Sequence, residues 1–251
     1  MIKKYIKGSS ETTRKNMDLY SVHRPKHQFP KTDEELGYYL AGLIDGDGCF
    51  VYLEISKDKI KNPQLVIVFH QKDAFWAYRL RTLIGYGNVR KILNKKAYKY
   101  IISNKNGFIK IHNLINGKLK IERKWFKFNR IAEHYGLFKT NLNTDLNLKN
   151  NHYLAGFIDA DGSLQIKIIK RNNDRYEIRI IIKVALQEKD YHIIELIKNN
   201  FNGYVGYRKS NKSYYYSSVS FKNLKNWIEY LDKYCLCSNK YKEYVIWRKV
   251  Y

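Results

Sequence analysis

Two acidic residues, Asp47 and Asp161, hold the same position in two nearly identical nine-residue segments, LAGLIDGDG at 40–48 and LAGFIDADG at 154–162. In each segment apolar residues recur at helical spacing and a glycine follows the acid, which predicts that the acid ends a helix. A carboxylate there opposes the helix dipole by about 0.3–1 kcal/mol. If the two helices pack together, the carboxylates converge on an oxygen site suited to Mg²⁺, which also takes phosphate oxygens and water. We therefore interpret both acids as catalytic metal ligands.

Other residues of the two segments are better explained by packing. Small side chains let two helix backbones approach closely, so the two segments are expected to form a direct helix contact. The small residues are Ala41, Gly42, Ala155 and Gly156. Asp45 and Asp159, two positions before the catalytic acids, are interpreted as structural.

The elements around the segments follow one order twice: helix, hairpin, helix, hairpin, helix. Thr32 or Asp33 is expected to cap the first helix, and Gly48 to end it. Alternating and β-branched runs predict strands, and longer periodic runs predict helices. In the first half these are strands at 49–56, 65–70, 88–93 and 97–103 and helices at 73–85, from Asn106, and at 125–138; in the second half they are strands at 163–170, 176–186, 204–210 and 213–220 and helices at 189–200 and from Asn223.

The spacing between the halves supports a duplicated domain. Asp47 and Asp161 are 114 positions apart, whereas Asp73 and Asp190 are 117 apart, so a small insertion near the first hairpin accounts for the difference. An α+β fold follows, with two pseudo-symmetric domains that meet through the repeated helices. The expected division is a basic N-terminal arm at 1–33, domains at 34–138 and 150–251, and a linker at 139–149.

The composition indicates a polyanionic partner. The chain has 47 Lys and Arg against 23 Asp and Glu, a formal net charge of +24, with hydrophobic residues at 44% for a folded core. Nucleic acid is the natural counterpart. No run approaches the ~20 apolar residues of a membrane-spanning helix. Cys49, Cys235 and Cys237 lack the spacing of a zinc site or a disulfide framework.

With its two nonapeptides in register and matched flanking elements, the chain over residues 34–251 resembles a two-motif, intron-encoded LAGLIDADG homing endonuclease. The resemblance implies two αββαββα domains that form a saddle of antiparallel sheets over double-stranded DNA. It implies that Asp47 and Asp161 bind divalent metal at the scissile phosphates, at a metal site in which we include Gly46 and Ala160. Mg²⁺ is the expected ion, with Mn²⁺ as a substitute.

The resemblance also implies hydrolysis of both DNA strands across the minor groove, leaving short 3′ overhangs. A polar residue near the end of each second strand would help to organise water: Gln187 in one half and His70 in the other, with Gln71 as the competing choice. A basic residue after each fourth strand would stabilise phosphate charge, which points to Lys105 and Lys222.

Sequence readout is expected from the strands and their loops. Four polar residues fall on one side of the strand after Asp161 and could read base edges: Ser163, Gln165, Lys167 and Arg171. Further DNA-binding candidates are Arg179, Lys183, Arg208, Lys209, Arg90 and Lys91. The first half differs, because the corresponding face carries Cys49, Val51, Leu53 and Ile55. That half is expected to read DNA by shape and apolar contacts, unless the strand register shifts.

Two other functions use the same scaffold. An intron maturase would bind intron RNA to help it fold, with or without DNA cleavage, and a DNA-binding regulator would have lost cleavage. The two acids favour cleavage, because binding alone does not require converging carboxylates. The chain is expected to act as a monomer with internal pseudo-two-fold symmetry. Its wealth of Lys, Asn, Ile and Tyr, encoded by AT-rich codons, suggests an organellar origin, in a mitochondrion rather than a chloroplast.

Overall fold

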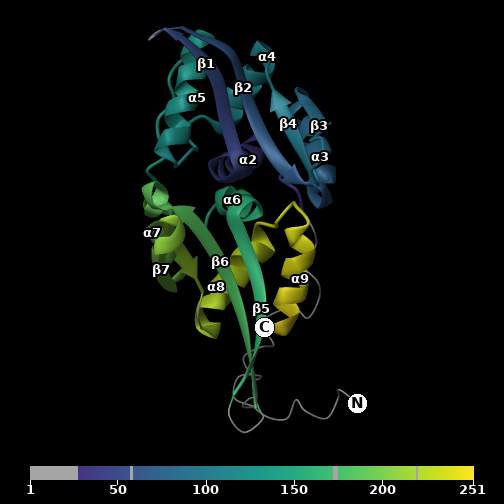
Figure 1. Cartoon of the computed structure of the whole chain (residues 1–251), viewed down its shortest axis with the longest axis vertical. Coiled ribbons are helices and arrows are strands. Elements are labelled where there is room, and N and C mark those ends of the chain that lie inside the picture. The colour runs from purple at the N-terminus through teal and green to yellow at the C-terminus, as the bar shows by residue number, and fades with distance from the viewer. Residues whose placement is uncertain (1–27, 57–58, 172–174, 219) are drawn as a thin grey trace.

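The elements of the protein follow its two sequence halves. The computed structural model describes residues 28–56, 59–171, 175–218 and 220–251. The first half contains α2 (Asp33–Asp47), β1 (Gly48–Ser56), β2 (Lys59–His70), α3 (Ala74–Ile84), β3 (Asn88–Lys91), β4 (Ala97–Ile102), α4 (Lys105–Ile115) and α5 (Glu122–His134). The second contains α6 (Tyr153–Asp161), β5 (Gly162–Lys170), β6 (Tyr176–Gln187), α7 (Tyr191–Phe201), β7 (Tyr204–Arg208), β8 (Ser213–Ser217), α8 (Phe221–Lys233) and α9 (Lys240–Val250). Figure 1 shows the two halves meeting at α2 and α6.

Helix α2 begins and ends as its sequence predicts. The Thr32 hydroxyl accepts a hydrogen bond from the Glu35 backbone N–H at 3.1 Å, and the Glu35 carboxylate accepts one from the Thr32 N–H at 3.4 Å. This capping box fixes the first turn. Gly48 at the C-terminus takes an extended conformation, so β1 starts directly after Asp47. The turn from helix to strand therefore fixes where Asp47 lies.

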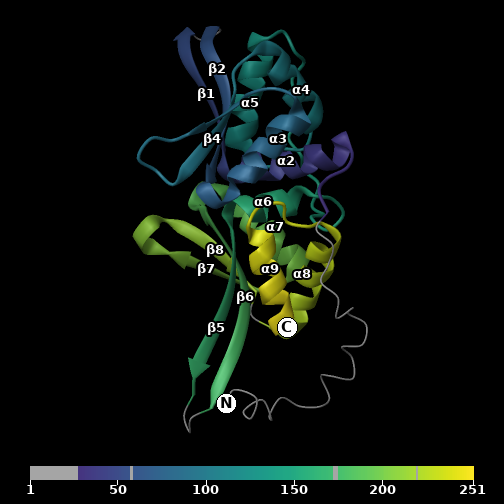
Figure 2. The same ribbon diagram turned by 90° about the vertical axis from the view of Figure 1, so that its right-hand side faces the viewer.

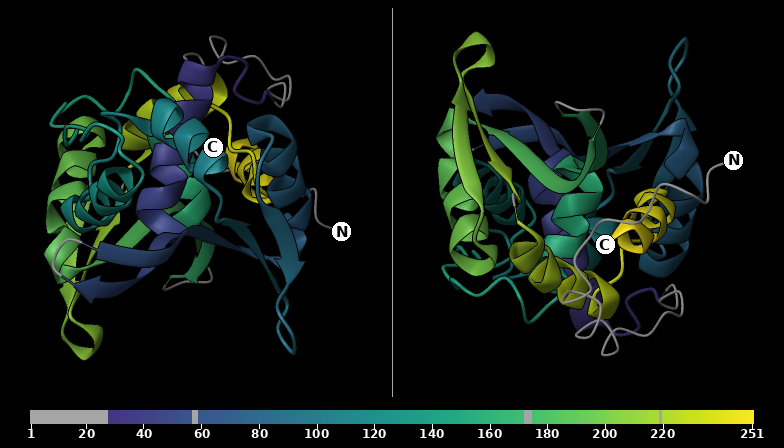
Figure 3. Two further views of the ribbon diagram at one scale, coloured as in Figure 1. Left: turned by 90° about the horizontal axis from the view of Figure 1, so that it is seen from above. Right: turned by 90° about the horizontal axis from the view of Figure 1, so that it is seen from below.

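Each half forms a four-stranded antiparallel sheet, with strand order β1-β2-β4-β3 in one half and β5-β6-β8-β7 in the other. The registers correspond, because Gly48 pairs with Ile67 and Gly162 pairs with Val184. In Figure 2 the helices cover one side of both sheets, while the β3–β4 and β7–β8 hairpins project on the other side. Figure 3 shows the two hairpins as diverging arms of a saddle. The α+β fold with two pseudo-symmetric αββαββα domains is confirmed.

Helices α2 and α6 touch through their glycines. A Cβ atom added to Gly42 would lie 1.9 Å from the Tyr153 carbonyl oxygen, and one added to Gly156 would lie 1.9 Å from the Tyr39 carbonyl oxygen. Both distances are far below van der Waals contact, so only glycine permits this approach. The close helix contact predicted from the small residues is confirmed.

Two reciprocal hydrogen bonds reinforce the helix contact. The Tyr39 hydroxyl donates to the Asp159 carboxylate at 2.8 Å, and the Tyr153 hydroxyl donates to the Asp45 carboxylate at 2.8 Å. All four side chains are buried. Each carboxylate also accepts backbone N–H groups from the segment that precedes the last helix of its own half. Asp45 and Asp159 thus have structural positions, as expected.

Some element boundaries differ from the sequence predictions. The last helix of the second half, α9, was not predicted, and its buried side chains are the aromatic residues Tyr241, Tyr244 and Trp247. A 3-10 turn at Glu188–Asp190 precedes α7, which therefore starts at Tyr191 and not at Lys189. Helix α8 starts two residues before Asn223.

The predicted arm and linker have contacts with the folded domains. Most of the arm lies outside the described residues, but Phe29 stacks on Trp76 with ring centroids 5.2 Å apart. In the linker, Thr140 and Leu148 are buried, and the Thr140 carbonyl accepts a hydrogen bond from the Trp125 indole N–H at 2.8 Å. Within the described ranges, no helix has the length and apolar character needed to cross a membrane.

Candidate active site and nucleic-acid interface

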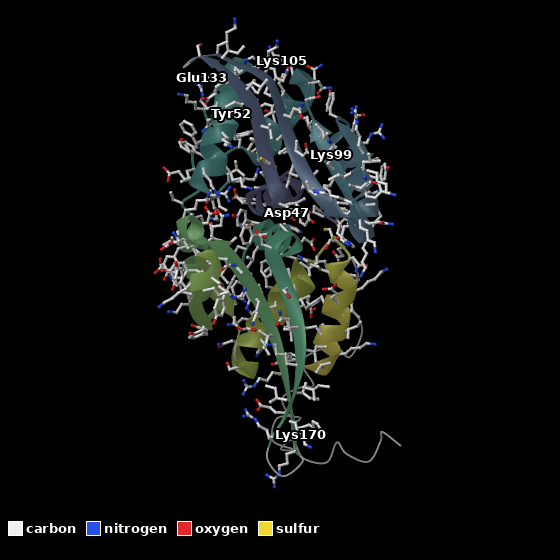
Figure 4. All side chains as sticks on the ribbon, in the orientation of Figure 1. Asp47, Tyr52, Lys99, Lys105, Glu133 and Lys170 are labelled. Atoms are coloured by element: carbon white, nitrogen blue, oxygen red, sulfur yellow. The ribbon has the colours of Figure 1, made fainter. Side chains whose placement is uncertain are left out.

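Asp47 and Asp161 lie next to each other where α2 and α6 end. A Cβ atom built on Gly46 would come within 3.1 Å of an Asp161 carboxylate oxygen, and 2.3 Å from the Ala160 Cβ. Figure 4 places Asp47 at the junction of the two halves. The fold therefore brings together two carboxylates that are 114 positions apart in the sequence.

The surroundings of both acids disfavour their charged forms. Desolvation and then the charge of Asp47 raise the pKa of Asp161 to about 6. The Asp47 side chain is open to solvent on one side, yet desolvation by the neighbouring protein still raises its pKa above the usual value. Two adjacent carboxylates in such a setting repel each other, and a divalent cation held by both acids would offset that repulsion.

The available donors fit Mg²⁺ better than an ion that needs a full protein cage. In the part of the chain that the structure describes, no group of three or more His, Cys, Asp or Glu side chains is placed to hold a metal. The pair Asp47 and Asp161 supplies two carboxylates, which suits Mg²⁺ because that ion keeps waters and substrate phosphate oxygens in its shell. The donor chemistry thus supports the expected ion.

A buried lysine closes the C-terminal end of α2. The Lys124 ammonium donates to the carbonyl oxygens of Ile44 at 3.0 Å and Gly46 at 3.1 Å, and also to that of Gly48. A cation at a helix C-terminus satisfies free carbonyls and offsets the dipole that Asp47 opposes. Lys124 also lowers the pKa of Asp47 by its charge, against the effect of desolvation.

Lys240 repeats this arrangement at the end of α6. Its ammonium donates to the carbonyl oxygens of Ile158 at 3.0 Å, Asp159 at 2.8 Å and Ala160 at 2.8 Å. Gly46 and Ala160, the two further residues of the predicted metal site, therefore each have a backbone carbonyl that accepts a hydrogen bond from a lysine. A carbonyl oxygen has two lone pairs, so one remains for another ligand.

Sequence reasoning missed Lys124 and Lys240, although a signal for them exists. They are 116 positions apart and lie near the start of α5 and of α9. Extending the comparison of the two halves into these helices would have paired them. The aromatic, highly charged sequence of α9 concealed this equivalence.

The predicted water-organising residues lie at the ends of β2 and β6. His70 lines a cleft together with Asp47, Asp73 and Lys240. Its Nδ1 accepts a hydrogen bond from the Lys72 N–H at 3.2 Å, which leaves Nε2 to carry the proton of the neutral ring. Gln71 instead begins the following 3-10 turn. The geometry therefore favours His70 over Gln71.

The remaining catalytic candidates have less central positions. Gln187 is exposed at the end of β6, at the place that corresponds to His70. Lys105 is the first residue of α4, and Figure 4 shows it at the far end of its domain from Asp47. The structure thus does not bring Lys105 to the acids, because β4 runs away from the helix interface. Lys222 lies in the first turn of α8, and its side chain is outside the described ones.

The uncovered face of the second sheet is polar along β5. Ser163 pairs with Lys183 on β6, and Lys167 pairs with Arg179. The Gln165 amide donates to the Ser163 hydroxyl at 3.1 Å, so these side chains lie on one face. The predicted polar side of this strand therefore includes Lys183 and Arg179 from the neighbouring strand.

Several of the basic candidates on this sheet already have partners. Arg171 and Arg179 both bind the carboxylate of Glu177 near the tip of the β5–β6 ribbon. The Arg208 guanidinium lies over the Tyr215 ring at 5.0 Å, and Lys183 lies over the same ring at 5.8 Å. These contacts hold the cations over the sheet face in the free protein. Lys209 is exposed in the turn between β7 and β8.

The structure separates Arg90 from Lys91 on β3. Arg90 is opposite Lys99 of β4, which Figure 4 labels, and strand alternation places both on the uncovered face. Lys91 is opposite Tyr98 and shares the helix-facing side with Val89, which packs against the core. Of the two, only Arg90 lies on the face expected to meet DNA.

Two acids at the ends of packed helices, beneath a saddle of two antiparallel sheets, define a two-domain α+β protein of duplicated architecture. The chain belongs to the LAGLIDADG endonuclease family, whose sequence model matches residues 40–135 and 154–251. Both family repeats therefore lie within this one chain.

Named relatives come from fungal introns. The chain is 42% identical to an uncharacterized cox1 intron-2 protein of Schizosaccharomyces pombe, over 98% of this chain and 75% of that protein. It is 28% identical to the intron-encoded DNA endonuclease aI3 of Saccharomyces cerevisiae, over 86% of this chain and 63% of that one. It is 27% identical to the intron-encoded RNA maturase bI4 of the same yeast, over 94% of this chain and 35% of the maturase. The chain thus spans well under two thirds of some relatives.

Solved structures show the same fold. The meganuclease I-SmaMI bound to uncleavable DNA superposes with a TM-score of 0.68 at 18% identity, over 85% of this chain and 89% of that one. The meganuclease I-AabMI bound to uncleaved DNA gives a TM-score of 0.67 at 18% identity, with the same coverage. At this identity the likeness concerns the fold.

Proposed function

We propose that this protein is a site-specific homing endonuclease that hydrolyses both strands of a long, asymmetric DNA target across the minor groove and leaves short 3′ overhangs. The observation that carries the proposal is the adjacency of Asp47 and Asp161 at the helix interface. Family membership and the basic saddle support it. The cofactor is Mg²⁺, which Mn²⁺ replaces.

The residues of the chain have distinct parts in this reaction. Asp47 and Asp161 supply the carboxylate oxygens that hold the cations, while Lys124 and Lys240 fix the helix ends from which both acids project. Bound divalent metal lowers the pKa of water and stabilises charge on the leaving oxygen. His70 and Gln187 orient water from the two strand ends. Lys105 and Lys222 contribute only to the positive electrostatic field around the DNA phosphates.

The DNA would lie along the uncovered faces of the two sheets. Phosphate contacts from lysine and arginine position a duplex, whereas base contacts in the major groove specify its sequence. Arg90, Lys167, Lys183 and Arg208 lie on these faces. The single chain supplies both halves of the site, so it acts as a monomer.

Substitution of the acids tests the proposal. Linear DNA that carries the host's intronless insertion site should be cut in Mg²⁺, and Asp47→Asn or Asp161→Asn should abolish double-strand cleavage while retaining binding. Glu133→Gln, an exposed acid far from Asp47 in Figure 4, serves as the matched control and should cut normally. Full double-strand cleavage by Asp161→Asn would refute the assignment. Binding without any cleavage by the parent protein would favour a regulator.

An RNA maturase is the second candidate function. The similarity to a yeast intron-encoded RNA maturase over 94% of this chain is the observation that favours it. Tight binding of the purified protein to its own intron RNA, with no response to any candidate DNA, would establish this alternative. Because the 42% identical relative is named for an intron of cox1, we place either activity in an organelle, namely the mitochondrion.

A further inference from the structure

The uncovered face of the first sheet carries exposed apolar side chains. On β1, Val51 is 46% exposed and Leu53 is 62% exposed, and on β2 Val68 is 44% exposed. Their neighbours along the strands face the helices: Phe50 and Phe69 are buried, and Tyr52, between Val51 and Leu53, packs against the core. Because side chains alternate along a strand, Val51, Leu53 and Val68 point to the opposite face. Large apolar side chains that gather on one surface indicate an interaction site.

The second sheet has polar residues at the places that match β1, whereas Val68 of β2 matches Ala185 of β6. Gly48–Ile67 and Gly162–Val184 are equivalent pairs, which fixes the alignment of the strands. One step along, Cys49 pairs with Val66 in the first sheet, where Ser163 pairs with Lys183 in the second. The two sheets therefore carry side chains of different chemistry at this equivalent pair of positions.

The contrast continues along the edge strands. Counted along the edge strands from Gly48 and Gly162, Val51 corresponds to Gln165 and Leu53 to Lys167, although the pairing of β1 with β2 shifts between Val51 and Leu53. Glutamine and lysine can hydrogen-bond to base edges, whereas valine and leucine cannot. The two halves thus present different chemistry to a partner that lies across both.

We call Val51, Leu53 and Val68 the apolar strip, and the basic residues beside it identify its partner. Val68 pairs with Lys99, and Lys99 pairs with Arg90, so cations border the strip on the same face. A DNA duplex combines phosphates with one apolar group in its major groove, the C5 methyl of thymine. Charge complementarity therefore favours DNA over an apolar protein surface.

We propose that Val51, Leu53 and Val68 contact thymine methyl groups, so that the half-site read by residues 34–138 requires thymine at these contacts. The other half-site is read by hydrogen bonds from β5 and β6. This inference rests on the proposed function, because it assumes that the sheets bind DNA. It assigns the sequence preference of one half of the target.

Uracil substitution tests the inference directly, because it removes the thymine methyl and preserves every base-pairing group. A duplex recovered from cleavage or binding selection on a randomised library is synthesised with dU in place of dT in one half-site at a time. Affinity should fall about fourfold for each contacted methyl in the half-site of the first domain, the effect of exposing one buried carbon. The half-site of the second domain should change less than twofold.

Protein variants provide the matched control. Leu53→Gln, at a largely exposed position, should retain the parental melting temperature and reduce the discrimination between dT and dU by about fourfold, the share of one methyl contact, whereas Gln165→Ala should leave it unchanged. Equal affinity for dT and dU duplexes in the first half-site would overturn the inference and leave the proposed function standing. Failure to bind any DNA would overturn both.

Discussion

At the residue scale, the acids could be predicted from the repeated motif, whereas their lysine partners emerge only when the comparison of the two halves is extended into α5 and α9. Asp47 and Asp161 stand in a repeated motif, so their pairing follows from the duplication alone. Lys124 and Lys240 reach the same helix ends from helices some 80 residues away, and one lysine among many carries no local signal. Only the folded chain shows which of its lysines are buried against backbone carbonyls.

The charge of Lys240 should set the pH at which the site accepts metal. Desolvation and Asp47 raise the pKa of Asp161 to about 6, while Lys240 lowers it. A carboxyl group must be ionised to bind a cation, so Mg²⁺ affinity should decline as the pH falls through about 6. Lys240→Met removes the lowering influence and should move this decline to higher pH. Calorimetric titration with Mg²⁺ measures it, and exposed Lys242→Met should leave the profile unchanged.

His70 offers a second prediction at this scale. Because Gln187 occupies the equivalent strand end, His70→Gln should retain cleavage of both strands, whereas His70→Ala should slow one strand on the order of 10²-fold. Single-turnover assays on DNA labelled in each strand separate the two rates. Equal slowing of both strands by His70→Ala would argue against a role in one half of the site.

At the element scale, the predicted order of helices and strands was confirmed, with the exception of α9. Periodic aliphatic residues identify α2 and α6, whereas α9 buries Tyr241, Tyr244 and Trp247 among many charges. Aromatic residues occur in strands as readily as in helices, so the sequence pattern alone was ambiguous. Packing of these rings against the rest of the second half stabilises α9 as a helix.

The contact between α2 and the start of α5 should make the stability of the folded protein depend on pH. Burial raises the pKa of Asp45 to about 7, and one of its oxygens accepts hydrogen bonds from Lys120, Ile121 and Tyr153. Since the pKa lies above the ordinary value near 3.8, the folded state holds an extra proton between about pH 4 and 7. This group's contribution to stability is therefore full below pH 4 and is lost as the pH rises through 7.

Asp45→Asn tests this linkage. Asparagine keeps the accepting oxygen without the charge, so the variant should exceed the parent's free energy of unfolding by more at pH 8 than at pH 5, because the parent loses stability throughout this range. Asp45→Ala should be destabilised at both, by about 1–3 kcal/mol for each donor left unpaired. Urea denaturation at the two pH values measures both variants. A parent protein that is more stable than Asp45→Asn at pH 8 would contradict the assignment.

At the scale of the whole molecule, contacts between the halves do not follow the internal symmetry completely. Arg123 forms a two-pronged ion pair with Asp190 across the interface, at 2.8 Å for its shortest contact. In the equivalent place Asp73 accepts the backbone N–H of Asn239 at 2.6 Å. The sequence spacing predicted that Asp73 and Asp190 correspond, but not that they bind partners in the opposite half.

The net charge of +24 should make DNA binding depend steeply on salt. The logarithm of the affinity should fall linearly with the logarithm of salt concentration, with a slope of about −0.9 for each phosphate neutralised. Arg90→Ala, on the uncovered face, should reduce the slope by about one unit. Lys198→Ala, on the helix layer, is the control. An unchanged slope for Arg90→Ala would exclude that residue from the phosphate contacts.

The contact of Gly42 and Gly156 with opposing carbonyl oxygens fixes the distance between α2 and α6, and therefore between the two acids at their ends. Backbone touches backbone there, so no side-chain rearrangement can alter the separation of α2 and α6. In the proposed reaction the offset between the two cuts is therefore set by the main chain, while target preference resides in side chains on the sheets. Under that proposal, substitutions on the sheets should change the target sequence without changing the length of the overhangs.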